Sequence, residues 1–538
     1  MQALTHRQEM NVDGLSYLDI ARAFGAGDLK TAINPHWGPL YPLLIAAGIR
    51  LEDAPRWESS VVHAVNFAIL IVALFAFDFL LGELLRLRGS RRENFDSPVV
   101  GDTAAILFAY AIFLYCTLEL NGLGLVTPDL CLAATVFTAG GLLLRLARVG
   151  PSWKDSLLLG GVLGLGYLAK SVMFPVGACF LVAAALVQRP RGRGLQHEIA
   201  SVAAFFAVAA VLIVPISRAT GRPTFGTAGP LAYAWEVNDV PYTNFQGDSN
   251  GVTRLLHPPK RLYQDPELYD FTGHLVGTYP PWFDPAYWNA GVRIGFRPWL
   301  QIRQLDRAAV FYVDLFLGSA GGVATLLVAL VWLYAERGAV DPDARLRLAL
   351  LLPALGALAL YAPVHVESRY IAPFAAVLWL VPVLTARWKN PRLPWGWTDR
   401  AAAIAACVLA VPVAVHTASD AWPTGDRPFV QWIVASDLRR MGLRQGDRVA
   451  VTGLTSPSQP DPAFETYWAH LVGAQVSAEI PRGEAFLCAD SAQTAPVYAI
   501  LTELRVRALV TRGLPSPSCA RGWQWIDGTK YYARMIPQ

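Results

Sequence analysis

Residues 59–86 read SSVVHAVNFAILIVALFAFDFLLGELLR and form the first long apolar stretch of the chain. A helix needs about 20 mostly apolar residues to cross the hydrocarbon core of a bilayer, and this stretch is long enough. The stretch ends at Arg86, and Arg88, Arg91 and Arg92 follow directly after it. Because basic residues gather in cytoplasmic loops, the stretch predicts a membrane helix that ends in the cytoplasm.

The composition of the whole chain is typical of a polytopic α-helical membrane protein. The 538 residues are 54% hydrophobic and only 16% charged, with a mean hydropathy of +0.35, whereas a soluble domain carries about 25% charged residues. Hydropathy predicts about ten spans. They lie near residues 59–86, 101–118, 128–147, 155–171, 173–188, 197–216, 311–335, 345–364, 370–387 and 400–418. The net charge of +4 is too small to indicate nucleic acid as a partner.

Every second short loop between these spans is basic, and these loops are predicted to be cytoplasmic. After the first loop, the basic residues are Arg145, Arg148, Lys154, Arg189, Arg191, Arg193, Arg337, Arg345, Arg347, Arg387, Lys389, Arg392 and Arg400. The intervening segments are predicted to lie outside: 1–58, 116–128, 170–173, 217–310, 365–370 and 419–538. The N-terminus then lies outside without an apolar run before it, so either a short tail is translocated or a first span precedes this sequence. We favour the second.

Two short helices are predicted on the outer membrane surface. Residues 14–26 place Tyr17 on an apolar face and Asp19 and Arg22 on a polar face, where the two charged side chains are close enough to pair. A second short apolar helix is expected after Pro42. The longer outer segment 217–310 is rich in aromatic residues and proline, above all at 277–288. That stretch could cap a site or bind sugar by stacking, or it could form an interfacial aromatic belt.

Residues 421–538 are more polar and predict a separate small α/β domain. Strands are expected at 448–452, 475–480 and 508–511, helices at 465–471 and 496–504, and an edge strand at 531–535. No G-x-G-x-x-G sequence is present, so no nucleotide site is predicted. An extracytoplasmic domain would allow a Cys488–Cys519 disulfide, with two free thiols as the alternative.

Charged residues at the predicted outer ends of the spans are the candidate catalytic groups, because charge near lipid is costly and often functional. Asp13 could act as a general base or simply cap the helix that it opens. Asp129 follows Thr127 and Pro128. It could orient a substrate or hold a divalent cation, or merely face the positive helix end, with Thr127 as the cap.

Two further positions could hold a phosphate. Lys170 lies between two apolar stretches, where it could bind a lipid phosphate or extend its amine to the membrane surface. The run His365-Val-Glu-Ser-Arg-Tyr370 offers Arg369 for two parallel hydrogen bonds to phosphate, or it is a solvated turn. Glu367 and Arg369 are two residues apart, so they need not pair. Together these groups supply what glycosyl transfer from a lipid phosphate requires.

At these residues the chain resembles the GT-C superfamily of integral-membrane glycosyltransferases. It is most similar to bacterial relatives of the protein O-mannosyltransferases and aminoarabinose transferases, the glycosyltransferase family 39-like enzymes. Asp13 looks like the family's catalytic carboxylate and Thr127-Pro-Asp129 like its second acidic position. Leu168-Ala-Lys170 and Glu367-x-Arg-Tyr370 are similar to its donor-phosphate segments. The likeness covers about residues 11–420, which would form the catalytic membrane domain.

The resemblance implies a polyprenyl-phosphate-linked monosaccharide as donor, membrane lipids as surroundings, and transfer with inversion to an unidentified acceptor. Lys170 and Arg369, with His365 and Tyr370, would bind the donor phosphate. Glu367, Tyr17 and His36 would support the site, and Mg²⁺ or Mn²⁺ on Asp13 and Asp129 is a candidate cofactor. The resemblance also implies a bacterial inner membrane, with the site and C-terminal domain on the periplasmic side.

The chain departs from the family at two points. The usual first span is absent, and the usual acidic pair is reduced to Asp13 followed by Gly14. A lipid-linked saccharide transporter or flippase is the alternative. It should show repeated halves and polar residues near the bilayer midplane, which the sequence does not display. A non-catalytic envelope protein is a third reading, in which Asp13 would be dispensable.

Overall fold

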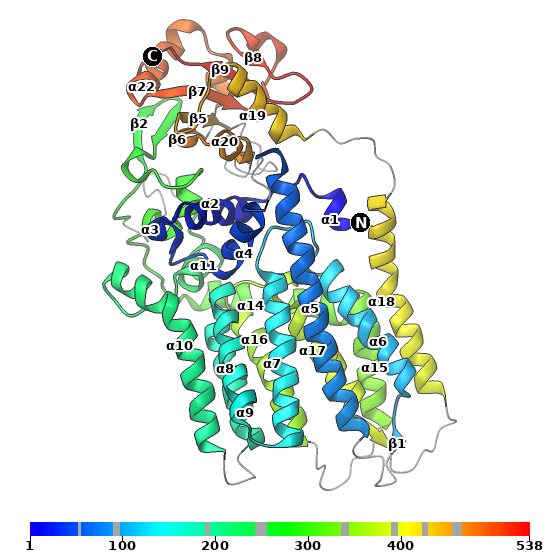
Figure 1. Ribbon diagram of the computed structural model, residues 1–538. Coiled ribbons are helices and arrows are strands. Elements are labelled where there is room, and N and C mark those ends of the chain that lie inside the picture. The colour runs from blue at the N-terminus through cyan, green and yellow to red at the C-terminus, as the bar shows by residue number, and fades with distance from the viewer. Residues whose placement is uncertain are drawn as a thin grey trace.

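The computed structural model describes residues 1–51, 55–89, 97–188, 194–242, 255–334, 344–388, 396–421, 429–453, 465–481 and 483–537. Long helices form a bundle at one end of the molecule, and an α/β domain caps the other end (Figure 1). Short helices of the N-terminal segment and of the 217–310 segment lie between them. The protein is therefore built in three tiers, with the shorter helices in the middle.

Helices occupy all ten stretches that the sequence predicts as spans. They are α5 (Glu58–Gly89), α6 (Asp102–Leu114), α7 (Asp129–Val149), α8 (Trp153–Ala169), α9 (Met173–Gln188), α10 (Leu195–Thr220), α15 (Ala320–Tyr334), α16 (Ala344–Tyr361), α17 (Ser368–Thr385) and α18 (Trp397–Ala421). Within the described ranges, 6 helices are long and apolar enough to cross a membrane, or up to 7 if a bent pair counts as one span. A mostly helical fold with several apolar candidate spans is confirmed, whereas the expected number of about ten spans stays a prediction.

The stretch 311–335, expected as one span, contains a bent pair of helices. Helix α14 (Pro298–Val313) runs on through the π-helical turn η6 (Asp314–Gly318), and α15 then leaves at 73°. Ser319 at the break is extended, and its hydroxyl accepts a hydrogen bond from the Gly321 amide. Ser319 thus caps the N-terminus of α15, a role in which serine is common. The apolar run bends at this residue.

The bundle is packed through aromatic and small residues. Phe77 of α5 packs edge-on against Phe137 of α7 at a centroid distance of 5.2 Å. Gly160 and Gly164 of α8 face α10 so closely that a Cβ atom on either would overlap α10 atoms. Small residues allow helix backbones to approach closely in membranes. At the far end of the bundle, β1 (Ser97–Pro98) pairs with β4 (Arg387–Trp388) and joins two loops.

The N-terminal segment packs into the protein on its polar side as well as its apolar side. It contains α1 (Gln2–Thr5), α2 (Val12–Ala26), α3 (Leu29–Ala32) and α4 (Leu40–Ile49). The expected pairing of Asp19 with Arg22 is wrong, because Asp19 contacts His470 and Arg22 contacts Glu58. The polar face of α2 therefore meets the α/β domain and α5 instead of water.

The sheet of the α/β domain has seven strands in the order β2-β3-β6-β5-β7-β9-β8. They are β2 (Lys260–Gln264), β3 (Glu267–Asp270), β5 (Arg448–Thr452), β6 (Gln475–Ile480), β7 (Val506–Thr511), β8 (Gln524–Trp525) and β9 (Tyr532–Met535). The central strands β6, β5 and β7 are parallel. Strand β9 pairs with both β7 and β8, so the expectation of an edge strand at 531–535 is wrong.

The 217–310 segment is part of this sheet, which the sequence did not predict. Strand β3 pairs antiparallel with β6, and β2 forms the sheet edge beyond it. The same segment carries α11 (Ala228–Glu236), α12 (Pro280–Phe283) and α13 (Pro285–Trp288) in the middle tier. It therefore connects the α/β domain to the end of the bundle that faces the middle tier.

Helices of the C-terminal region pack around the sheet. They are α19 (Val430–Arg440), α20 (Tyr467–Val472), α21 (Glu484–Cys488) and α22 (Ser491–Glu503). Asp490 and Gln493 form a capping box at the start of α22. Cys488 and Cys519 form a disulfide, which decides between the two alternatives left by the sequence.

Candidate active site

The five charged residues singled out in the sequence converge at the junction of the bundle and the middle tier. Asp13 lies in the first turn of α2, and Asp129 is the first residue of α7. Lys170 follows α8 directly, and Glu367 and Arg369 lie at the start of α17. Since α7, α8 and α17 all begin or end here, their terminal residues meet at one level of the bundle.

The arrangement contradicts the capping roles that the sequence offered for Asp13 and Thr127. Asn11 occupies the N-cap position of α2, and Asp13 makes no capping hydrogen bond. Pro128, rather than Thr127, precedes the first residue of α7. Asp129 still benefits from the positive end of the helix, but its carboxylate points to cationic side chains from other elements.

Arg369 is the centre of the cluster. Its guanidinium lies 3.6 Å from Asp13 Oδ2 and 3.7 Å from Asp129 Oδ2. Lys170 Nζ donates a 2.5 Å hydrogen bond to Asp129 Oδ1. Two carboxylates and two cations thus alternate in a mostly buried group. Arginine suits this place because its planar guanidinium can serve several oxygens at once.

Glu367 pairs with Arg369, although the sequence did not require it. Arg369 Nε donates to Glu367 Oε2 at 2.5 Å, and His365 Nε2 lies 3.0 Å from Glu367 Oε1. The other nitrogen of His365 lies 3.4 Å from Glu236 at the end of α11. Sequence reasoning missed Glu236, because nothing local distinguishes it from any other acidic residue of the long 217–310 segment.

Tyr370 takes part mainly through its ring. Lys170 Nζ lies 3.6 Å from the centroid of the Tyr370 ring, a cation–π contact that holds the ammonium in place. Tyr361 stacks on the Tyr370 ring, with 5.3 Å between the ring centroids. The Tyr370 hydroxyl accepts a 3.3 Å hydrogen bond from Arg369. Tyr370 is therefore placed to orient both cations.

A glycine allows the N-terminal segment to reach Lys170. A Cβ atom on Gly38 would lie 2.5 Å from the carbonyl oxygens of Leu168 and Ala169. Only a residue without a side chain permits this approach. The loop before α4 thus packs directly against the end of α8, next to Lys170.

Tyr17 and His36 lie in the aromatic wall around the cluster. Tyr17 is buried edge-on against Trp37 and Tyr41. His36 packs on Trp37 and Trp235, and burial lowers its pKa to about 4, so it is neutral near pH 7. These aromatic contacts agree with the supporting role that the sequence suggested for both residues.

The aromatic stretch at 277–288 contributes a direct partner of Asp13. Trp282 Nε1 donates a 3.3 Å hydrogen bond to Asp13 Oδ1, and the Trp282 ring stacks on Trp235 at 5.7 Å. Of the two uses expected for this stretch, its place over Asp13 agrees with capping a site. The sequence showed the richness in aromatics but not which tryptophan reaches the carboxylate.

The electrostatics of the cluster favour a carboxylate at Asp13 that accepts protons readily. Burial raises the pKa of Asp13 above its usual value, and the positive charge of Arg369 opposes this rise. Burial would also raise the pKa of Glu367, but hydrogen bonds from His365 and Arg369 outweigh it and lower the value to about 2. Asp13 is therefore the more basic of these two carboxylates.

The donor set does not favour a divalent cation at Asp13 and Asp129. Among the described residues, no group of three or more His, Cys, Asp and Glu side chains has a metal-binding arrangement. Both carboxylates already face Arg369, and Asp129 also binds Lys170. Mg²⁺ prefers oxygen ligands and retains several waters, so it would have to displace these cations.

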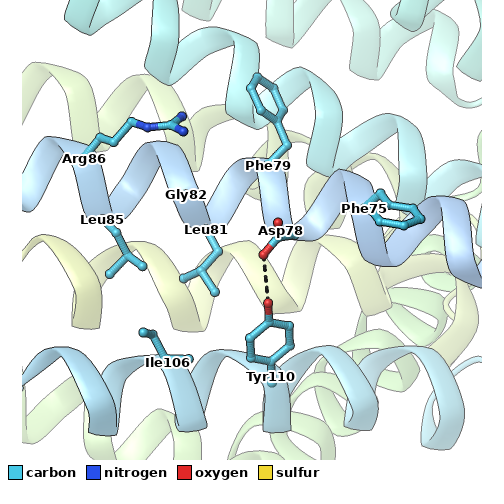
Figure 2. A pocket seen from close by; sticks show the side chains of 9 residues that line it. All are labelled: Phe75, Asp78, Phe79, Leu81, Gly82, Leu85, Arg86, Ile106 and Tyr110. Atoms are coloured by element: carbon cyan, nitrogen blue, oxygen red, sulfur yellow. Dashed lines mark hydrogen bonds between the residues drawn. The ribbon is translucent and has the colours of Figure 1, made fainter.

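A separate cavity of about 380 Å³ lies on the side of the bundle, between α5 and α6. Figure 2 shows Tyr110 donating a 2.8 Å hydrogen bond to Asp78 within it. The residues that line this cavity are Phe75, Asp78, Phe79, Leu81, Gly82, Leu85, Arg86, Ile106 and Tyr110. It shares no residue with the charged cluster, so it is not part of the candidate active site.

Comparison with known proteins supports glycosyl transfer as the class of activity. Residues 90–216 match the family described as dolichyl-phosphate-mannose-protein mannosyltransferase. The matched segment is less than half of the chain, and it includes Asp129 and Lys170 but not Asp13 or Arg369. The predicted resemblance to membrane glycosyltransferases is confirmed by this match. No curated protein matches the chain significantly.

Among solved structures, the chain is similar to the Archaeoglobus fulgidus oligosaccharyltransferase, crystallised tethered through a disulfide to an acceptor peptide containing the NVT sequon. The sequences are 13% identical, and the TM-score is 0.40. The match covers 88% of this chain but 60% of the archaeal enzyme.

Proposed function

We propose that the protein is a membrane glycosyltransferase that moves a monosaccharide from a polyprenyl-phosphate donor to an extracytoplasmic acceptor, with inversion. The observation that carries this proposal is the position of Arg369, which lies within 3.7 Å of both Asp13 and Asp129 while Lys170 binds Asp129. A base and two phosphate-binding cations are thus adjacent at one end of a membrane bundle, where a lipid carrier can present its head group.

In the proposed reaction, Asp13 accepts the proton of an acceptor hydroxyl or amine. The freed electron pair forms a bond to the anomeric carbon of the sugar. The bond from that carbon to the phosphate oxygen breaks, and its electrons remain on the polyprenyl phosphate. Lys170 and Arg369 stabilise the negative charge that develops on the leaving phosphate. Single displacement of this kind inverts the configuration of the sugar carbon.

The remaining charged groups position these three residues. Asp129 is almost fully buried, with 1% of its side chain exposed, and provides a counter-ion for both cations. Glu367 orients Arg369, and His365 links Glu367 to Glu236. Tyr370 accepts a hydrogen bond from Arg369, and His365 contacts Glu367, the partner of Arg369, so both residues are proposed to join the donor-phosphate site.

For the location, we propose a bacterial cytoplasmic membrane in which the cluster and the α/β domain lie outside the cytoplasm. The alternation of basic loops supports this orientation. The Cys488–Cys519 disulfide also supports it, since disulfides persist mainly in oxidising compartments. Residues 1–420 would form the catalytic membrane domain and residues 421–538 the outer domain, joined by β2 and β3.

The test uses the full-length protein in lipid nanodiscs with radiolabelled polyprenyl-phosphate monosaccharides and an envelope extract as the acceptor source. Asp13→Asn should lower kcat by about 10²–10⁴-fold, the usual contribution of a general base. Asp527→Asn, at an exposed carboxylate of the α/β domain, is the matched control and should leave transfer unchanged. Undiminished transfer by Asp13→Asn would contradict the assignment of the base. Lipid translocation without transfer in proteoliposomes would favour the flippase alternative.

A further inference from the structure

A second buried charged cluster joins the α/β domain to α2 and α5. His470 of α20 has no exposed side-chain surface, and its Nδ1 lies 2.7 Å from Asp19 of α2. Its Nε2 lies 3.0 Å from Glu58 at the start of α5. Arg22 of α2 lies 2.9 Å from the other oxygen of Glu58 and also donates a 2.8 Å hydrogen bond to the His470 carbonyl. Three elements from distant parts of the chain are thus held together.

Asp19 also fixes the segment that covers Asp13. Both the amide and the hydroxyl of Thr278 donate to the Asp19 carboxylate, at 2.6 and 2.8 Å. The Thr278 carbonyl accepts from Val476 of β6. Four residues further on, Trp282 donates to Asp13. Asp19 therefore holds the segment whose tryptophan contacts the proposed base.

Helix α2 carries Asp13 as well as Asp19 and Arg22 of this second cluster. Helix α2 has 15 residues, so a shift at Asp19 is transmitted along a rigid rod to Asp13. Buried charged groups are a costly way to stabilise a fold, and apolar residues of similar size often do as well or better. Removing one member, however, leaves the others uncompensated. Such a cluster therefore fixes one docking position more effectively than it adds overall stability.

We propose that His470 is a positioning residue for Asp13, and that the α/β domain is consequently part of the catalytic unit rather than an appended module. This inference rests on the proposed function. Among the described contacts, His470 touches neither Asp13 nor the proposed phosphate-binding residues Lys170 and Arg369. Its effect passes along α2 and through the segment from Thr278 to Trp282. Loss of His470 should thus disturb the base while leaving the donor-phosphate contacts of Lys170 and Arg369 intact.

The test compares His470→Gln with His416→Gln in the full-length protein in nanodiscs. His416 is 58% exposed and pairs with Glu119 on the side of the bundle, so it is a matched control. In His470→Gln, hydrogen exchange of the amides in residues 12–26 should become faster and kcat should fall by about 100-fold, a typical cost of misplacing a reacting group by about 1 Å. The KM for the donor should stay within about twofold of the wild type, because the cations that bind the phosphate are untouched.

Asp19→Asn is a second variant that keeps the size of the side chain. It should likewise lower kcat while leaving the KM for the donor nearly unchanged. Melting temperatures identify any variant that fails to fold. Unchanged exchange of residues 12–26 in both variants would overturn the proposal, and so would faster exchange with normal kcat. If the wild type transfers no sugar, the proposed function fails. Hydrogen exchange then still decides whether His470 holds α2.

Discussion

Lys170 Nζ lies 2.5 Å from Asp129 Oδ1, so a lysine at the end of α8 is bound to a carboxylate at the start of α7. The Asp129 side chain is 1% exposed, and its second oxygen has no hydrogen-bond partner among the described residues. That oxygen lies 3.7 Å from Arg369. Asp129 is therefore better placed to hold the two cations than to act as a second base.

Replacement of Asp129 should destabilise the protein more than replacement of an exposed aspartate. We expect Asp129→Asn to lower the free energy of unfolding by about 3–5 kcal/mol, because the buried cations lose their counter-ion. The Asp129→Asn/Lys170→Gln double variant should recover part of the loss, with a coupling of about 0.5–3 kcal/mol. Denaturation in detergent measures both values, with Asp527→Asn as the control. Strict additivity of the two single changes would contradict the pairing.

Arg369 should set the acid limit of activity as well as the affinity for the donor. Burial raises the pKa of Asp13, and the charge of Arg369 counteracts the rise. Arg369→Gln removes that charge, so the pKa of Asp13 should increase further. A base acts only when deprotonated, and the acid limb of the kcat/KM profile should therefore move to higher pH.

The control for this prediction is Arg369→Lys, which keeps the charge but loses the planar guanidinium. It should weaken donor binding while leaving the acid limb near its wild-type position. Superimposable acid limbs for the wild type and Arg369→Gln would show that Arg369 does not act on the base.

His365 should make stability decrease at alkaline pH. Burial alone would lower its pKa, but hydrogen bonds to Glu236 and Glu367 outweigh burial and raise the pKa from 6.5 to about 9. The protonated form is thus favoured in the folded protein. Its stabilising effect is complete below pH 6.5 and is lost as the pH rises through about 9.

His365→Gln removes this titration. Its melting temperature should accordingly fall less than that of the wild type between pH 6.5 and 9. His416→Gln, at an exposed histidine, should follow the wild type. Parallel curves for His365→Gln and the wild type would rule out a protonated His365 in the folded state.

The disulfide allows two tests, one of stability and one of the side of the membrane on which the α/β domain lies. Replacement of Cys488 and Cys519 by serine should lower the free energy of unfolding by about 2–4 kcal/mol, the usual effect of losing such a cross-link. In intact cells, a membrane-impermeant maleimide should label this pair only after treatment with an impermeant reductant. Labelling that requires permeabilised membranes would instead place the α/β domain in the cytoplasm.

Much of the candidate site could be predicted because charge is rare in apolar surroundings. Asp129 and Lys170 stand out beside apolar runs. Asp13 and Arg369 lie in polar runs and were indicated by their position near predicted spans and by the family resemblance. The structure brings all four together. Their partners could not be found in the same way. Glu236, Trp282 and His470 lie in polar or aromatic segments, where such residues are common, and only their contacts distinguish them.

By itself, the sequence determined where helices form and which strands build the C-terminal core, because apolar runs and alternating patterns are local properties. Only the tertiary structure decided that the run at 311–335 bends at Ser319, that β2 and β3 extend the C-terminal sheet, and that the polar face of α2 is buried. These features depend on hydrogen bonds and ion pairs between segments far apart in the chain. Their free energy arises when the segments pack together, and no local pattern records it.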